Sequence, residues 1–217
     1  ETMSLALTVR SIGGGIIPFI APLSDSRGRK FGMLLGLGLF TISMGIVVIF
    51  PTFPALFASM FFATLAKYIF DPAMQAYLGD RTPYERRGRV LAITELGWSL
   101  AFILGVPLMG FLIARNGWMS PFPLLTILGI VTFVLIIFQI PNDETNVLQR
   151  GTTRANFRRV FSCIPAIAGL SVGLWATVGN EIVNLVFGVW LEDSFGLQIA
   201  ALGASAAVIG FSELGGE

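Results

Sequence analysis

The sequence predicts an all-α membrane protein, a polytopic bundle of seven transmembrane helices. Of its 217 residues, 54% are apolar and only 12% are charged, and the mean hydropathy is +0.79. Average soluble domains carry about 25% charged residues, so this chain lacks the polar surface that covers a soluble globule. Seven apolar runs are long enough to span a bilayer, and the connections between them alternate between basic and non-basic.

Each apolar run approaches or exceeds the roughly 20 residues that a helix needs to cross a bilayer. Strands of a membrane barrel are about ten residues long and alternate in polarity, which these runs do not. The expected helices cover residues 3–23, 31–50, 54–78, 90–113, 121–140, 164–191 and from about 198 onward.

The connections between these helices set the expected orientation. Residues 24–30, 79–89 and 141–162 together hold eleven of the fourteen basic residues, whereas the intervening connections hold only Arg115. The positive-inside rule places the three basic connections in the cytoplasm of a multi-pass plasma-membrane protein. Trp118 and Trp190 are expected at the outer interface, and Trp175 is not.

Composition also excludes several classes of protein. With no His and one Cys, imidazole chemistry, metal clusters and an intrachain disulfide are all ruled out for this chain. No H-E-x-x-H or G-x-S-x-G motif indicates a membrane-embedded enzyme, and no selectivity loop indicates a channel. We therefore expect no enzyme activity, no metal, no cofactor and no nucleic-acid partner.

Charged residues inside a membrane are costly, so their positions are the best functional signal. The runs 31–50 and 121–140 contain none and are expected to face lipid, with the most exposed apolar surface. The other helices would then surround a polar interior. The candidates for a substrate or proton pathway are Arg10, Lys67, Asp71, Glu95, Asn180, Glu181, Asn184 and Glu213.

Structural roles remain open for several of these residues. Lys67 and Asp71 are four residues apart and could neutralise each other, and Arg10 could extend toward the interface. Glu95 could instead reach the loop arginines. Asn180 and Asn184 could form interhelical hydrogen bonds, with Glu181 expected to face the central cavity. The glycines at 179 and 188 predict local loosening of that helix.

The connection "APLSDSRGRKFG" combines a tight turn with three basic residues. Gly28 permits a positive φ there. The order of residues in this connection resembles the loop signature of the major facilitator superfamily, although Pro22 and Ser26 depart from that signature. The residues that match the signature are Leu23, Ser24, Asp25, Gly28, Arg29 and Lys30, and Arg27 belongs to the same cytoplasmic loop motif.

A second segment, "LGDRTPYERRGR", is similar to the segment after the family's fourth helix and contains Asp80 and Arg87. Charge complementarity and the resemblance both predict a salt bridge between Arg29 and Asp80.

The resemblance also implies how the chain is divided. Residues 1–140 would be an N-terminal bundle lacking its first helix, and the polar residues 141–162 a cytoplasmic linker. Residues 163–217 would be the first two helices of a C-terminal bundle. We therefore expect the chain to be a fragment that is similar to the second to eighth helices of the twelve-helix fold.

The fourth expected helix carries small residues that allow close helix contact, together with a proline that bends the helix. They are similar to the Gly-Pro motif of the family's antiporters, except that Val106 and Phe111 depart from it. Ordinary helix packing is an equal alternative. The residues concerned are Gly97, Gly105, Pro107 and Gly110.

The resemblance implies a secondary transporter that moves a small solute by alternating access, coupled to protons, with export favoured over uptake. Asp71, Glu181 and Glu213 are the candidate proton carriers. The full-length protein is expected to work as a monomer in the bilayer. A symporter for uptake and a non-transporting receptor on the same scaffold are the alternatives.

Overall fold

The structure, a computed structural model, describes residues 27–141 and 161–216 of the chain. The first expected helix, with Arg10, as well as Asp25 and most of the linker lie outside the described residues. So do the side chains of Glu181, Asn184 and Glu213, although their backbone lies in described helices.

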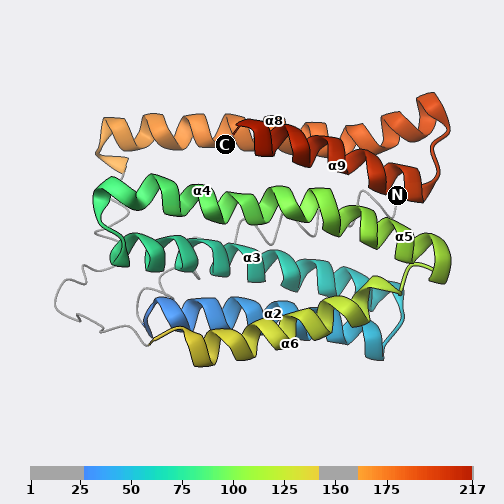
Figure 1. Ribbon diagram of the computed structural model, residues 1–217, viewed down its shortest axis with the longest axis horizontal. Helices are drawn as coiled ribbons and strands as arrows, with labels where there is room; N and C mark the ends of the chain where they lie inside the picture. The colour runs from blue at the N-terminus through green and yellow to red at the C-terminus, as the bar shows by residue number, and fades with distance from the viewer. Residues whose placement is uncertain (1–26, 142–160, 217) are drawn as a thin grey trace.

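Every regular element in the described ranges is helical, which confirms the all-α prediction (Figure 1). Four helical stretches are long and apolar enough to cross a membrane, including a continuous span over 84–116 that matches the run expected at 90–113. The elements are α2 (Arg29–Ile49), α3 (Phe53–Arg81), α4 (Tyr84–Leu100), η1 (Ala101–Gly105), α5 (Val106–Asn116), α6 (Pro121–Gln139), α8 (Ile164–Phe195) and α9 (Ile199–Gly216).

The ends of these helices follow from local sequence. Thr52 precedes α3, and its hydroxyl accepts a hydrogen bond from the Ala55 amide at 3.4 Å, as an N-cap does. Gly28 precedes α2 with φ 103°, as the sequence predicts, and Gly196 ends α8 with φ 63°. Both backbone conformations are strained for residues with a side chain, so glycine suits the turn before α2 and the end of α8.

The helices lie side by side along the long axis of the molecule (Figure 1). Contacts between neighbours give the order α6, α2, α3, α4, α9 and α8, with η1 and α5 also packed on α9. The starts of α2, α4 and α8 and the ends of α3 and α6 share one end of the bundle, which we call the basic-loop end. The opposite end is the distal end.

The core lies where α2, α3 and α6 meet near the basic-loop end. Its most buried residues are Met33, Ala73, Tyr77 and Ile136, each at most 8% exposed. One helical turn from Met33, Gly36 lets α2 approach α3 closely, because a Cβ there would lie 2.8 Å from the Ala66 carbonyl oxygen. This core fixes α2 relative to α3, the two helices that are joined by the Arg29–Asp80 contact at the basic-loop end.

The expectation that both charge-free helices face lipid is wrong for α2. Its most apolar window is 33% buried, the largest share among the four spans, whereas α6 is 17% buried. The reason is that α2 has a face of small residues, including Gly32, Gly36 and Ser43, that fits between α3 and α6. An absence of charge permits contact with lipid but also permits burial against other helices.

The tryptophans lie along the helices as the sequence predicts. Trp118 is in the turn between α5 and α6 at the distal end, where its ring stacks on Phe53 at 6.3 Å. Trp190 lies near the distal end of α8 and contacts the ring of Phe195 at 5.3 Å. Trp175 lies in the interior of α8. The first two positions suit the interfacial preference of indole rings.

Candidate functional site

An ion pair occupies the middle of α3. Lys67 is the central residue of this 29-residue helix, and its Nζ donates a hydrogen bond to Oδ2 of Asp71 at 2.7 Å. The mutual neutralisation that the sequence left open is therefore present. The two side chains are 48% and 39% exposed, so the pair is accessible rather than sealed.

The ring of Trp98 on α4 holds the same ammonium group from a second side. Lys67 Nζ lies 4.5 Å from the centre of the indole ring, which is a cation–π contact. Sequence reasoning missed Trp98. The available signal was its place in the middle of an apolar span, because tryptophans of membrane helices concentrate near the two interfaces.

Pro72 follows Asp71 directly inside α3. Because proline has no backbone N–H, it cannot donate the helical hydrogen bond to the carbonyl of Tyr68. The missing hydrogen bond weakens α3 at the turn that carries the ion pair, so the backbone can move there more easily than elsewhere in the helix.

Glu95 is the other predicted acidic residue of this region. It lies on α4 three residues before Trp98, so both occupy the same side of the helix. Its side chain is exposed, and it forms no ion pair with any residue in the described ranges. The contact with loop arginines that the sequence left open is not formed there.

A turn of π-helix, η1, separates α4 from α5. The amide of Val106 bonds to the carbonyl of Ala101, five residues back, and Pro107 follows at once. This geometry is a π-bulge, a feature frequent at functional sites. Phe102 in this turn meets the ring of Trp98 edge-on at 5.5 Å. The bulge therefore touches the ion-pair site from within the same span.

The same span packs against α9 through glycines, and we call this contact the α9 seam. A Cβ added at Gly110 would lie 3.2 Å from the Cα of Gly203. One added at Gly210 would lie 2.8 Å from the carbonyl oxygen of Ser99 and 2.9 Å from the Cβ of Phe102. The backbones meet directly, so few larger side chains fit in the seam.

Two residues of the predicted packing motif lie in this seam. Gly110 and Pro107 both lie in the α9 seam, with the Pro107 Cα 3.5 Å from a Cβ added at Gly203. No neighbouring helix in the described ranges approaches a Cβ added at Gly97 or Gly105, so a packing role for these two glycines stays a prediction. They lie on sides of the span that the seam does not cover.

The basic-loop end contains the predicted salt bridge. Arg29 Nε lies 3.5 Å from Oδ2 of Asp80, which confirms the expected pairing of the two loops. Lys30 donates to the carbonyl of Ile137 in the last turn of α6 at 2.9 Å, which satisfies a helix-end acceptor. These contacts tie the ends of α2, α3 and α6 together.

Two other residues of the loop motif have local partners. Arg87 donates from Nε to the carbonyl of Thr82 at 3.1 Å, which closes the turn between α3 and α4. The Arg27 guanidinium lies 5.2 Å from the centre of the Phe31 ring. Their geometry indicates bracing of the loop.

The roles predicted for the polar residues of α8 and α9 stay predictions. Asn180 is exposed on α8, and the roles predicted for Glu181, Asn184 and Glu213 lie outside the described side chains. The predicted loosening at Gly179 and Gly188 is wrong, because α8 runs without a break from Ile164 to Phe195. Among the described residues, no group of three or more His, Cys, Asp or Glu could hold a metal.

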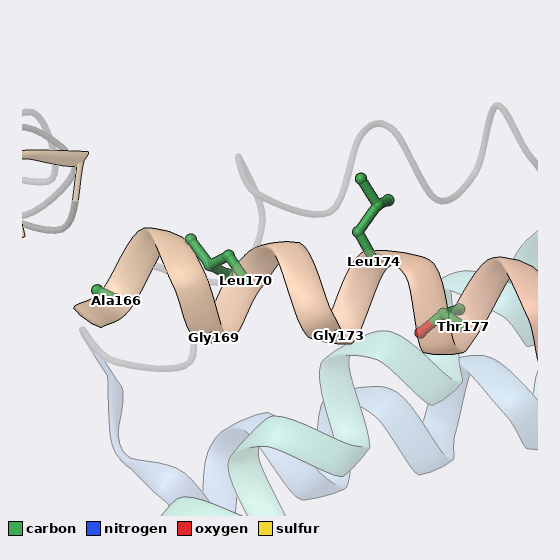
Figure 2. Close-up of a pocket in the computed structure, with 6 residues that line it drawn as sticks. All are labelled: Ala166, Gly169, Leu170, Gly173, Leu174 and Thr177. Atoms are coloured by element: carbon green, nitrogen blue, oxygen red, sulfur yellow. The ribbon is translucent and has the colours of Figure 1, made fainter. Parts of the chain in front are cut away.

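A shallow apolar hollow runs along the first half of α8 (Figure 2). Gly169 and Gly173 lie in it four residues apart, and no described atom comes within 4 Å of a Cβ added at either. A face with this small-x-x-x-small spacing suits close packing of another helix. The lining residues are Ala166, Gly169, Leu170, Gly173, Leu174 and Thr177.

Known proteins resemble this chain over nearly all of its length. The sequence profile of the Major Facilitator Superfamily matches residues 1–216. The uncharacterized MFS-type transporter YceJ of Bacillus subtilis (strain 168) is 26% identical over 94% of this chain and 53% of its own length. Multidrug resistance protein 1 of the same organism is 24% identical over 90% of this chain and 51% of its own. A third relative there, the uncharacterized MFS-type transporter YwfA, is 36% identical over 50% of this chain and 27% of its own length. The chain thus spans about half the length of the first two relatives.

Proposed function

Because the chain belongs to the major facilitator superfamily, we propose that its full-length protein is a secondary active transporter that moves a small solute by alternating access. The observation that carries this proposal is the Lys67–Asp71 ion pair at the centre of a membrane span. Ionisable residues at that depth are costly even when they are paired, and where they occur they mark substrate or ion pathways. Relatives that are named as transporters also argue against an enzyme.

In this proposal two helical bundles move against each other around the ion-pair site. Residues 1–140 belong to the first bundle, 141–162 form the linker and 163–217 begin the second bundle. The α9 seam is where the two bundles would meet, and its direct backbone contact suits sliding better than interlocked long side chains would. The salt bridge between Arg29 and Asp80 would hold the basic-loop end in one of the two states.

Protons are the proposed coupling ion. Protonation of Asp71 would remove the negative charge that binds Lys67, so the pair offers a two-state element sensitive to a proton. Arg10, Glu95, Asn180, Glu181, Asn184 and Glu213 are proposed to complete the pathway.

We further propose export by antiport. The Gly-Pro resemblance in the α9 seam supports this direction, as do two relatives that bear the name multidrug resistance protein. The proposed setting is the plasma membrane with the basic loops in the cytoplasm and the full-length chain acting as a monomer. Solute uptake by symport and a non-transporting receptor are the alternative functions.

Proteoliposomes that contain the full-length protein provide the test. With an imposed proton gradient, we expect at least one solute from a chemically broad panel to accumulate and to drive a matching proton flux, read by a trapped pH dye. Asp71→Asn should abolish this coupled flux while the protein remains folded and inserted. Folded wild-type protein that moves none of the solutes would favour the receptor. Solute and proton moving in the same direction would favour uptake by symport.

A further inference from the structure

We propose that Asp71 and Trp98 form a binding site for a protonated organic amine, and that the side chain of Lys67 occupies this site in the structure. The proposal rests on the transport function proposed above and names the class of its substrate. It starts from the two contacts that surround one nitrogen atom.

The nitrogen in question is Nζ of Lys67. It donates to Oδ2 of Asp71 at 2.7 Å and lies 4.5 Å from the centre of the Trp98 ring. A charge-assisted hydrogen bond to a carboxylate together with an aromatic face is the chemistry that recognises an alkylammonium group. Lys67 is itself an alkylammonium, so its nitrogen marks where the nitrogen of a ligand would lie.

The site is open to exchange. Lys67 and Asp71 are 48% and 39% exposed, and Trp98 is 43% exposed. Lysine carries its charge on a flexible four-carbon stem, so it can leave the site without a change in the backbone.

The surrounding charges favour a cation over an anion. Glu95 lies one helical turn from Trp98 and has no ion-pair partner in the described ranges. Among the described residues, the region therefore carries two carboxylates and one ammonium group. An incoming anion would meet this excess of negative charge, whereas a second cation would balance it.

The neighbouring surface indicates what else the ligand carries. Phe102 meets the Trp98 ring edge-on at 5.5 Å and extends the aromatic surface beside the nitrogen position. The ligand is thus an amine with an apolar body. Because the 2.7 Å contact requires an N–H donor, a protonated tertiary amine should bind better than its quaternary analogue.

Three matched probes test this proposal by calorimetry on the purified full-length protein: benzyldimethylamine, benzyltrimethylammonium and the neutral N,N-dimethylbenzamide. The protonated amine should bind most tightly, the quaternary ion more weakly and the amide least. Lys67→Met should raise the affinity for the amine about tenfold, because the competing side chain is gone.

Variants of the two site residues, Asp71 and Trp98, should lower the affinity for the amine, whereas Lys67→Met should raise it. Trp98→Leu should weaken amine binding by about 5- to 30-fold, with Trp98→Phe between the two. Asp71→Asn should abolish it. Trp175→Leu is the matched control, since Trp175 is 72% exposed on α8 and should leave affinity unchanged.

Three outcomes would overturn the proposal: no amine binding by folded wild-type protein and Lys67→Met, an unchanged or lower affinity in Lys67→Met, or tighter binding of benzoate that Lys67→Met abolishes. The last would make Lys67 an anion-binding group.

The transport proposal is tested by different results. If the variants change amine binding as expected but no solute flux is found, the amine site stands and the transport function is refuted. If other solutes show proton-coupled flux and no amine binds, the transport function stands and the amine site is refuted.

Discussion

At the scale of single residues, Arg29 and Asp80 join the start of α2 to the end of α3. Their side chains are 31% and 68% exposed, so solvent screens the pair and its contribution to stability is small. The role of the salt bridge would be to hold the basic-loop end in one arrangement. Lys30 also contacts the last turn of α6 at this end.

Removal of this salt bridge should therefore affect transport more than stability. We expect Arg29→Ala to lower the free energy of unfolding by less than about 1 kcal/mol. Transport should fall by about fivefold or more, as for a lost coupling between two states. Thermal unfolding in detergent and uptake into proteoliposomes measure the two effects. The swap of Arg29→Asp with Asp80→Arg should restore transport, and Arg86→Ala, which removes an exposed arginine at the same end of the bundle, is the control. A swap as inactive as the single variant would refute the role of the pair.

Glu181 is the acidic residue predicted at mid-depth in α8. We expect Glu181→Gln to fold and insert normally, because the amide keeps the shape and part of the hydrogen bonding, but to abolish or uncouple transport. Solute-driven proton flux compared with solute flux checks this. Normal transport with the pH dependence of the wild type would assign Glu181 a structural role.

At the scale of elements, glycine positions decide which helices pack. Gly36 and Gly38 both lie on α2, but a Cβ at Gly36 would lie 2.8–2.9 Å from atoms of Ala66 and Phe70. The corresponding distance at Gly38 is an ordinary 3.5 Å to the ring of Phe133. The sequence does not distinguish the two glycines, since both sit in the same apolar run.

We expect Gly36→Ala to destabilise the protein by about 1–3 kcal/mol, because the backbone of α3 cannot move away cheaply. Gly38→Ala should be neutral or slightly stabilising, since alanine favours a helix by up to about 1 kcal/mol over glycine. Both variants gain the same helix propensity, so the difference between their unfolding temperatures isolates the packing. Equal unfolding temperatures would contradict the close approach of α2 and α3.

At the scale of the whole molecule, the helix ends divide into two sets, and Cys163 marks one of them. It is exposed just before α8 at the basic-loop end. Asn116 lies at the end of α5, on the distal side. The positive-inside rule assigns the first set to the cytoplasm.

Cysteine labelling tests this orientation in a full-length protein whose other cysteines are replaced by serine. A membrane-impermeant maleimide should label Cys163 in inside-out vesicles and not in intact cells. Asn116→Cys in a Cys163→Ser background should show the reverse. Labelling of Cys163 from outside intact cells would overturn the proposed topology.

Composition and spacing alone determined the all-helical membrane class and the approximate extents of the four spans in the described ranges. Charge complementarity and the family resemblance together gave the pairing of Arg29 with Asp80. Span length and the cost of charge in lipid act locally, so they can be read from a run of residues. Resemblance in the loop motif added the family.

Only the tertiary structure decided which residues meet between helices. It packed one face of α2 between α3 and α6 and placed Trp98 over Lys67. It also brought Gly110 against Gly203 of α9 and Gly210 of α9 against Ser99, while leaving Gly97 without a neighbouring helix in the described ranges. The physical reason is that an apolar or small residue is equally suited to lipid and to another helix. The shape of the neighbouring helix surface decides whether such a residue contacts lipid or another helix. That shape is set by residues far away in the sequence.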